Sequence, residues 1–339
     1  FQTRWSIEHG LPVLRRHGWN VLSRTPGSYA LRIQTAVHLA ERYASTYGRP
    51  DVVHALSAQW AGGAAARLAR QWNCPMALTE HFTGFRRGAL FAEQRHWARQ
   101  AFGRADSVAA VSPPLRLTLN AGGWHPASDT FLIPNPVDLS FFTPPRARSA
   151  PPPVVWAGVG HLVPAKGFDL LMQAVARVVA DGFDVRLHLA GDGPEREALQ
   201  ALACDLGIRH RVQFHGYVSR VDVRRLLQQA HGYVLASRHE TFGIPVVEAL
   251  ACGCAVVATR CGGPEYVLPT DSGHLVEPES VEALHRGLRQ VTRALQDDSC
   301  TLPEPDVRSV LQKRFSYDTF VTNTTALYQT AYRRRAAHR

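Results

Sequence analysis

The stretch Gly232–Tyr266, GYVLASRHETFGIPVVEALACGCAVVATRCGGPEY, decides the fold. Its apolar run at 233–236 is typical of a buried parallel strand, and a second such run follows at 255–258. Between them, Pro245 suits the first turn of a helix and Gly253 suits a left-handed cap at its end. The stretch therefore predicts a strand–helix–strand unit. Its loop, 237–243, follows the carboxyl end of the first strand, where open α/β sheets usually bind ligands.

Two carboxylates flank the turn in this loop. Glu240 lies on the loop and Glu248 near the start of the predicted helix, with seven residues between them. Taken alone, this spacing equally describes a capping acid and a charge on an exposed helix face. Beside a glycine turn and an exposed helix N-terminus, two acids suit a ligand that carries both phosphate and sugar hydroxyls.

The motif ExxFGIPVVEALACGCAVVAT, followed by GGPEYV, resembles the signature of the family 4 retaining glycosyltransferases. The resemblance implies an α/β protein of the GT-B fold, with two Rossmann-like domains whose parallel sheets face each other across a cleft. It also implies a C-terminal helix that crosses back to the first domain. The similarity covers essentially the whole chain and is strongest over residues 135–278.

Length and composition agree with two soluble-type domains. At 339 residues the chain can form two cores. It contains neither an apolar run of about 18 residues nor a signal-peptide pattern at its start. Six cysteines in a chain of this length do not form a disulfide framework, so we expect buried thiols in a reducing cytosol.

Alternating helices and strands predict parallel βαβ units in both halves. In the first half we expect helices at 2–17, 31–47, 61–71 and 88–102, and strands at 20–22, 52–54, 76–78 and 107–111. In the second half we expect strands at 154–157, 185–189 and 212–214, and helices at 168–180, 194–206, 221–230, 281–295 and 315–334.

The domain boundaries follow from a Pro-rich stretch that resembles the family's hinge. We expect an acceptor-side domain at 1–138, a linker at 139–153, a donor-binding domain at 154–314 and a returning terminal helix at 315–339. The alternation opens with a helix, and the Gly-Gly turn that family members normally have at this place is absent here. We therefore expect the first domain to lack its initial strand.

Charge is concentrated in the first half. Residues 1–150 hold 17 Arg and 8 acids, a net charge of +9, whereas the whole chain carries +10. No nucleic-acid motif accompanies these arginines, so we expect an anionic membrane surface or acceptor rather than nucleic acid. The segments 85–87 and 95–99 are candidates for that surface, with a solvated face as the alternative. A general preference for Arg over Lys explains the composition equally well.

A glycine-containing loop follows the strand at 154–157. Gly160, His161 and Lys166 lie in it, just before a helix, so it suits a phosphate as well as an ordinary strand-to-helix turn. It is not a P-loop, because Gly and not Ser or Thr follows the lysine. By resemblance, Lys166 binds the diphosphate of the donor. His161 replaces the family's Arg, so either Lys166 carries most of the load or His161 binds the diphosphate in its protonated form.

Two further loops resemble the donor site of the family. Gly191 and Gly193 form a G-x-G-P turn that lines the nucleotide in the family, although a tight turn alone explains the pattern. Tyr217 follows the next strand and corresponds to a loop beside the base, with a packed aromatic as the alternative.

In the first domain, His81 lies just after the strand at 76–78. A histidine at a strand end is commonly structural, but the family has a histidine here that contacts the donor sugar and its phosphate. His54, at the end of the preceding strand, is the second candidate.

By resemblance, Glu240 contacts the donor sugar and Glu248 the ribose. The backbone of Phe242, Gly243 and Ile244 would then lie against sugar and phosphate. These assignments predict a hexosyltransferase that uses a UDP- or GDP-sugar as substrate, with retention and with neither cofactor nor metal.

The expected acceptor is a glycan, a lipid-linked sugar or a small molecule. The expected location of the protein is the cytoplasm, where it would bind peripherally at the inner face of the cell membrane. A catalytically silent nucleotide-sugar-binding protein is the alternative. An NAD-dependent oxidoreductase is disfavoured, because no G-x-G-x-x-G follows a strand with an acid about 20 residues later.

Overall fold

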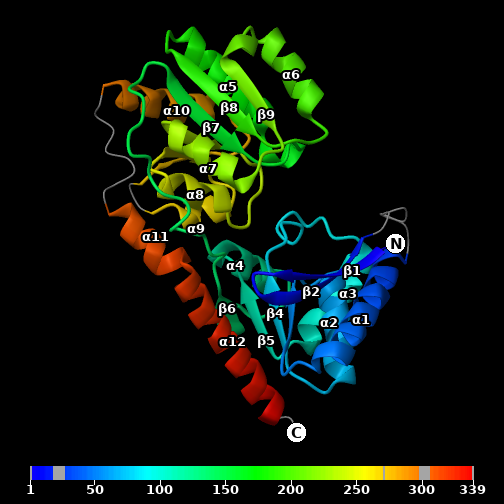
Figure 1. The fold of residues 1–339 in the computed structure, drawn as a ribbon. Helices are drawn as coiled ribbons and strands as arrows, with labels where there is room; N and C mark the ends of the chain where they lie inside the picture. Colours follow the sequence, from blue (N-terminus) through cyan, green and yellow to red (C-terminus); the bar gives the residue numbers. More distant parts are fainter. Residues whose placement is uncertain (1, 18–26, 270–271, 298–305, 338–339) are drawn as a thin grey trace. The chain divides into compact units, whose positions relative to one another are not determined.

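The computed structural model describes residues 2–17, 27–269, 272–297 and 306–337. The chain divides into two compact units (Figure 1). Unit 1 contains residues 1–133 and 321–339, and unit 2 contains residues 134–320. Each unit has its own parallel sheet, as the α/β prediction requires.

Unit 1 is built on a four-stranded parallel sheet in which strand order follows chain order. Its strands are β3 (Val53–Leu56), β4 (Met76–Glu80), β5 (Ser107–Ala110) and β6 (Thr130–Leu132). Its helices are α1 (Ser28–Tyr47), α2 (Trp60–Gln71), α3 (Ala92–Arg104), α4 (Pro113–Ala121) and the short η1 (Ala127–Asp129). All five residues of β4 are buried, so this strand lies within the core.

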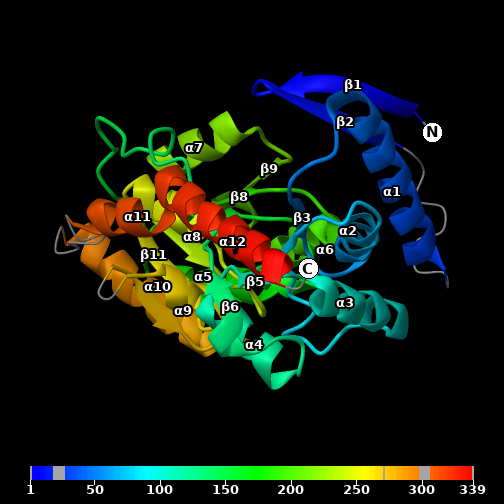
Figure 2. The same cartoon turned by 90° about the horizontal axis from the view of Figure 1, so that it is seen from below.

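The helix predicted at 2–17 is wrong. The chain there forms an antiparallel hairpin of β1 (Gln2–Glu8) and β2 (Leu11–His17), which lie side by side next to α1 (Figure 2). His9 and Gly10 make the two-residue turn, both with positive φ (50° and 81°), as tight hairpins require. Trp5 packs against Tyr43 and Tyr47 of α1 in a tilted and an edge-on contact, so tertiary packing outweighs the helical pattern. The strand predicted at 20–22 lies outside the described residues.

Unit 2 contains a six-stranded parallel sheet with the order β12-β11-β10-β7-β8-β9. The strands are β7 (Val154–Val159), β8 (Val185–Ala190), β9 (Val212–Gly216), β10 (Gly232–Leu235), β11 (Ala255–Thr259) and β12 (His274–Val276). The order runs outward from β7 to one side and from β10 to the other. The chain therefore reverses its direction of winding between β7 and β10, and such a switch point is where doubly wound sheets open a crevice.

The helices of unit 2 cover both faces of this sheet (Figure 1). They are α5 (Phe168–Ala180), α6 (Arg196–Asp205), α7 (Arg220–Gln229), α8 (Ile244–Ala251), α9 (Gly263–Val267), α10 (Val281–Gln296) and α11 (Val307–Phe315), with short turns η2 (Pro164–Lys166) and η3 (Arg209–Arg211). One apolar core joins α5, α6 and α10 to the sheet, and fully buried Trp156 donates to the Thr292 hydroxyl within it (3.1 Å).

The last helix, α12 (Tyr317–Ala337), begins in unit 2 and ends in unit 1, as the GT-B resemblance predicts. In unit 1 it lies beside β6 in both views (Figures 1 and 2). Tyr328 contacts His54 (2.9 Å), and Arg334 pairs with Asp129. These contacts attach the end of the chain to the first sheet.

Two smaller expectations have mixed outcomes. Cys252 and Cys254 are buried thiols, and burial raises the pKa of each to about 12. Cys204 is exposed, so the expectation of buried thiols does not hold for this cysteine. Over the described part of the chain, no helix is both long and apolar enough to cross a membrane.

Candidate functional site

The loops that follow β7 and β10 carry the two central predicted residues of unit 2. Because these strands pair in parallel, their carboxyl ends lie at the same edge of the sheet, next to the switch point. Lys166 belongs to the loop after β7, and Glu240 belongs to the loop after β10. Topology thus brings together two residues that the sequence separates by 74 positions.

Lys166 and Glu240 form an ion pair at this edge. Lys166 Nζ lies 2.6 Å from Glu240 Oε2, with 28% and 13% of the two side chains exposed. The other carboxylate oxygen accepts the Thr241 N–H at 3.2 Å. From the sequence, the lysine is expected at the phosphate and the glutamate at the sugar. In the structure the two groups are direct neighbours.

Two helix N-termini flank this ion pair. Gly167 caps α5 with φ 64°, and Gly243 caps α8 with φ 94°; neither helix has a side-chain hydrogen bond at its N-cap. The first-turn N–H groups of a helix generally have no partner within the helix. In α8, Pro245 has no N–H and the Val246 N–H donates to the Gly243 carbonyl at 2.9 Å. The N-terminus of α5 and the Ile244 N–H are therefore the backbone groups that suit an anion beside Lys166.

Close backbone packing requires glycine at Gly191 and Gly193. A Cβ on Gly191 would lie 1.9 Å from the Gly160 carbonyl oxygen, and one on Gly193 would lie 2.4 Å from that of Leu162. The ordinary turn interpretation is therefore sufficient for these two positions. At Gly160 a Cβ would make only van der Waals contact with the stem of Lys166, at 3.6 Å or more, so the lysine lies along this glycine.

His161 and Tyr217 both lie on the surface. His161 is exposed directly after Gly160. Tyr217 is 90% exposed, so it is not the packed aromatic that the sequence left as an alternative. Both side chains are accessible to a ligand, and their donor contacts remain predictions.

Glu248 lies on α8 and is largely buried. Burial raises its pKa to about 7, and the charge of Arg220 opposes this shift. Burial also raises the pKa of Tyr233, a fully buried residue of β10, with smaller contributions from the charges of Glu240 and Glu248. Both acids therefore lie within electrostatic reach of the same strand. A largely buried carboxylate is not the exposed helix charge that the simpler interpretation required.

In unit 1, His81 is exposed directly after β4. The residue before it, Glu80, is fully buried and accepts the backbone N–H groups of His81 and Phe82, both at 2.8 Å, and of Ala58 at 2.7 Å. Burial raises the pKa of Glu80 to about 7, although these hydrogen bonds oppose the shift. The predicted histidine is thus held by a buried acid that sequence reasoning did not single out.

His54, the second candidate in unit 1, has a structural role. Its Nε2 lies 2.9 Å from the Thr79 hydroxyl and its Nδ1 lies 2.9 Å from the Tyr328 hydroxyl. Burial lowers its pKa to about 4. Both ring nitrogens are used to join β3, β4 and α12.

A second residue that sequence reasoning missed lies inside the opening stretch. Arg238 forms a bidentate ion pair with Asp169 of α5, at 3.0 and 2.7 Å, and so links the loop of Glu240 to the helix that follows Lys166. An arginine two positions before Glu240 is visible in the sequence. Its partner could not be identified without the order of the strands.

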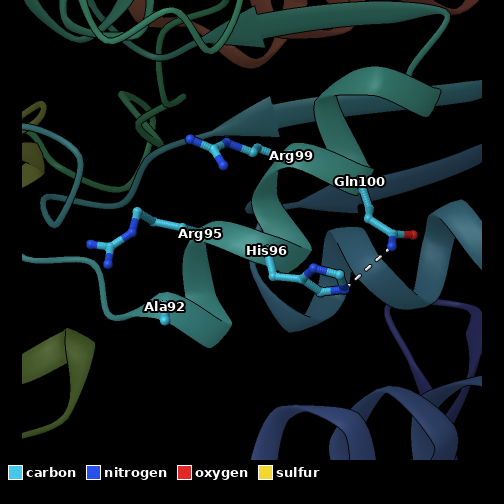
Figure 3. A pocket seen from close by; sticks show the side chains of 5 residues that line it. All are labelled: Ala92, Arg95, His96, Arg99 and Gln100. Carbon is cyan, nitrogen blue, oxygen red and sulfur yellow. Dashed lines mark hydrogen bonds between the residues drawn. The ribbon is translucent and has the colours of Figure 1, made fainter.

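The basic segment at 95–99 lies on α3 (Figure 3). A surface hollow of about 460 Å³ is lined by Ala92, Arg95, His96, Arg99 and Gln100. The guanidinium groups of Arg95 and Arg99 extend in the same direction, one helical turn apart, while His96 turns toward Gln100 at 3.3 Å. None of the ion pairs between described residues involves Arg95 or Arg99.

Curated relatives share part of this sequence. The chain is 30% identical over 214 residues to a subunit of the phosphatidylinositol N-acetylglucosaminyltransferase of Arabidopsis thaliana, which covers 63% of the chain and 46% of the relative. It is 38% identical over 140 residues to the lipopolysaccharide core biosynthesis glycosyltransferase LpsE of Rhizobium meliloti, covering 41% and 39%. The chain thus spans less than half the length of these relatives.

Solved structures share the fold. Sucrose-phosphate synthase from Thermosynechococcus elongatus aligns with a TM-score of 0.74 at 22% identity, over 91% of this chain and 80% of that one. Anabaena HepE in complex with UDP-glucose aligns with a TM-score of 0.71 at 21% identity, over 86% and 82%. At these identities the likeness concerns the fold alone.

Two family descriptions match adjoining parts of the chain. "Glycosyltransferase Family 4" matches residues 4–141 and "Glycosyl transferases group 1" matches residues 146–297. Together they extend over both units and over the loops of Lys166 and Glu240. The chain therefore belongs to the family 4, group 1 glycosyltransferases and has their GT-B fold.

Proposed function

We propose that this protein is a retaining hexosyltransferase that moves a sugar from a UDP- or GDP-sugar to an acceptor hydroxyl without a metal. The observation that carries the proposal is the Lys166–Glu240 pair between two glycine-capped helix N-termini at the switch point of unit 2. This arrangement offers a cation and backbone donors for a diphosphate, and a carboxylate for sugar hydroxyls.

Transfer breaks the bond between the anomeric carbon and the diphosphate oxygen and forms a bond to the acceptor oxygen. Positive charge builds on the sugar, and negative charge builds on the departing diphosphate. Lys166, the N-terminal N–H groups of α5 and the Ile244 N–H of α8 would stabilise the departing charge. Glu240 would orient the sugar hydroxyls and stabilise the positive charge beside it. The acceptor proton leaves with the diphosphate, so no net charge remains on the protein.

The remaining donor contacts are assigned as follows. The ribose hydroxyls would donate to Glu248, whose partly desolvated position strengthens such bonds. We assign the base edge to Tyr217, and the sugar and phosphate to the backbone of Phe242, Gly243 and Ile244. We assign the diphosphate to Gly160 and His161, and the lining of the nucleotide site to the backbone of Gly191 and Gly193. We assign His81 of unit 1 to the donor sugar and its phosphate. The UDP-glucose complex of Anabaena HepE supports a nucleotide-sugar donor.

The acceptor side rests on unit 1. The names of the relatives speak of a phosphatidylinositol and of a lipopolysaccharide core, which supports a glycan or lipid-linked acceptor. The arginines of α3 would attract an anionic acceptor or an anionic membrane surface. We propose a cytoplasmic protein that binds peripherally at the inner face of the cell membrane.

One experiment separates this function from that of a silent nucleotide-sugar-binding protein. Calorimetry with a panel of UDP- and GDP-sugars measures binding, and release of the nucleoside diphosphate measures turnover. Binding together with release supports the transferase. Binding without release, with acceptors of both soluble and lipid-linked kinds present, supports the silent binder. The absence of any binding contradicts both.

A further inference from the structure

Arg238 is attached to both sides of Lys166. Its backbone N–H donates to the Ala165 carbonyl at 2.9 Å, and its guanidinium donates to the Pro164 carbonyl. The same guanidinium holds both carboxylate oxygens of Asp169 in the first turn of α5. The residues that precede and follow the lysine are therefore bonded to one arginine on the loop of Glu240.

The two loops are also in backbone contact. Gly167 has φ 64°, and a Cβ there would lie 2.1 Å from the Ala236 carbonyl oxygen. Only glycine permits this approach, because a side chain at this position would separate the loops. The backbone of the lysine loop is thus packed against the residues that lead from β10 to Glu240.

The charges of the clamp formed by Arg238 and Asp169 support each other. Burial alone would raise the pKa of Asp169, but the hydrogen bonds and charge of Arg238 outweigh it and hold that pKa below its usual value. The hydrogen bonds from Arg238 to Asp169 likewise raise the pKa of the arginine. With 24% and 37% of their side chains exposed, the two residues are partly desolvated, and the bidentate geometry fixes their orientation.

We propose that Arg238, together with Asp169, is a positioning residue. It holds Lys166 and Glu240 at the spacing at which both can bind the diphosphate-sugar. Arg238 does not touch the donor in this proposal. It fixes the distance between the backbones that carry the cation and the carboxylate. The inference rests on the proposed function, because it assumes that the two side chains share one ligand.

The test compares a nucleoside with its diphosphate. Titrations with uridine, UDP, guanosine and GDP give, for whichever base the parent prefers, the gain in affinity that the diphosphate adds. Arg238→Gln removes the guanidinium group that makes the two bonds, and Asp169→Asn removes the charge of the carboxylate that accepts them. Each should reduce the affinity for the diphosphate about 10-fold, as expected for a displaced binding group, while the nucleoside affinity changes less than twofold. The double variant should resemble either single variant, because both changes break the same clamp.

Two controls complete the test. Arg177 lies on α5, like Asp169, and forms an exposed ion pair with Glu282 of α10. Arg177→Gln removes that pair and should leave both affinities unchanged. Arg238→Lys keeps the charge but loses the two-bond geometry of the guanidinium group. Its diphosphate affinity should therefore fall between those of the parent and Arg238→Gln. This variant remains informative if the glutamine variant unfolds.

The possible outcomes distinguish failure of the proposed function from failure of the Arg238–Asp169 clamp. If the parent binds neither diphosphate, the proposed function fails and the clamp with it. If the parent binds but the variants keep its diphosphate affinity within twofold, only the clamp is overturned. A parallel loss of nucleoside and diphosphate binding also overturns the clamp, because it indicates a general structural role.

Discussion

Lys166 Nζ lies 2.6 Å from a carboxylate oxygen of Glu240. A diphosphate that binds the lysine must therefore compete with the glutamate for the same cation. Release of Glu240 then coincides with arrival of the donor, whose sugar hydroxyls can replace the lysine as partners. Removal of the Glu240 carboxylate is therefore expected to strengthen diphosphate binding rather than weaken it.

Glu240→Gln should bind the bare nucleoside diphosphate more tightly than the parent does. The substitution frees Lys166 from an ion pair worth about 1 kcal/mol, so we expect about fivefold tighter binding by calorimetry. Turnover of the sugar donor should fall in the same variant. Glu277→Gln, which removes an equal charge from an exposed position of unit 2, should change neither property. Weaker diphosphate binding by Glu240→Gln would show that the pair does not compete with the ligand.

Glu248→Gln should stabilise the protein at pH 8 when no donor is added. The carboxyl of Glu248 has a pKa of about 7 in the folded protein, against an ordinary value of 4.5. Between these values the unfolded chain loses a proton that the folded chain keeps, so this group reduces stability as the pH rises from about 4.5 to 7. Replacing it should add about 2–3 kcal/mol to the free energy of unfolding at pH 8 and little at pH 4.5.

Chemical denaturation at both pH values measures this difference, with exposed Glu197→Gln on α6 as the control. Comparison with the parent at each pH removes the contribution of Glu80, whose pKa is raised to the same range. The variant should also lose affinity for the nucleoside, because an amide accepts ribose hydroxyl bonds less strongly than a carboxylate. Equal stability at pH 8, or unchanged nucleoside binding, would contradict the assignment of Glu248.

His161→Arg should strengthen binding of the diphosphate. His161 is exposed on the loop of Lys166, where the family pattern has an arginine. A guanidinium is charged at all working pH values and binds phosphate through two parallel bonds. We expect about 10-fold tighter diphosphate binding at pH 8. His210→Arg, an equal change at another exposed position of unit 2, should have no effect. Equal gains in the two variants would indicate a general effect of net charge.

The arginines of α3 should bind an anionic membrane. Cosedimentation with vesicles containing phosphatidylglycerol should weaken with rising salt, and Arg95→Ser combined with Arg99→Ser should weaken it by about 10- to 30-fold. Arg225→Ser combined with Arg286→Ser removes the same charge from exposed positions of unit 2 and is the matched control. If the parent and the α3 variant bind the vesicles equally, this helix has no role in membrane binding.

Much of the fold follows from the sequence because local patterns agree with tertiary packing. Helix α5 has the predicted bounds, 168–180, since its apolar residues recur near a helical period and face one core. The strand–helix–strand unit of the opening stretch is confirmed, including Pro245 in the first turn and Gly253 with φ 77° after the helix. In these places propensity, periodicity and caps indicate the same structure.

The sequence-based predictions are wrong or incomplete where a contact between residues far apart in the sequence determines the structure. The hairpin at 2–17 depends on Trp5 packing against α1, which no local pattern reveals. The Lys166–Glu240 pair and the Arg238–Asp169 clamp depend on β7 and β10 being neighbours. Sequence motifs identified the residues of the first pair, but not their contact. Neither member of the clamp was predicted, because each looks like a surface charge until the strand order is known.

The initial rate of nucleoside diphosphate release by Lys166→Ala, with the preferred donor and acceptor at saturation, tests the central claim most directly. If Lys166 stabilises the departing diphosphate, its removal should cost about 2–4 kcal/mol of transition-state stabilisation, a rate loss of roughly 30- to 1,000-fold. A rate within threefold of the parent would contradict the account.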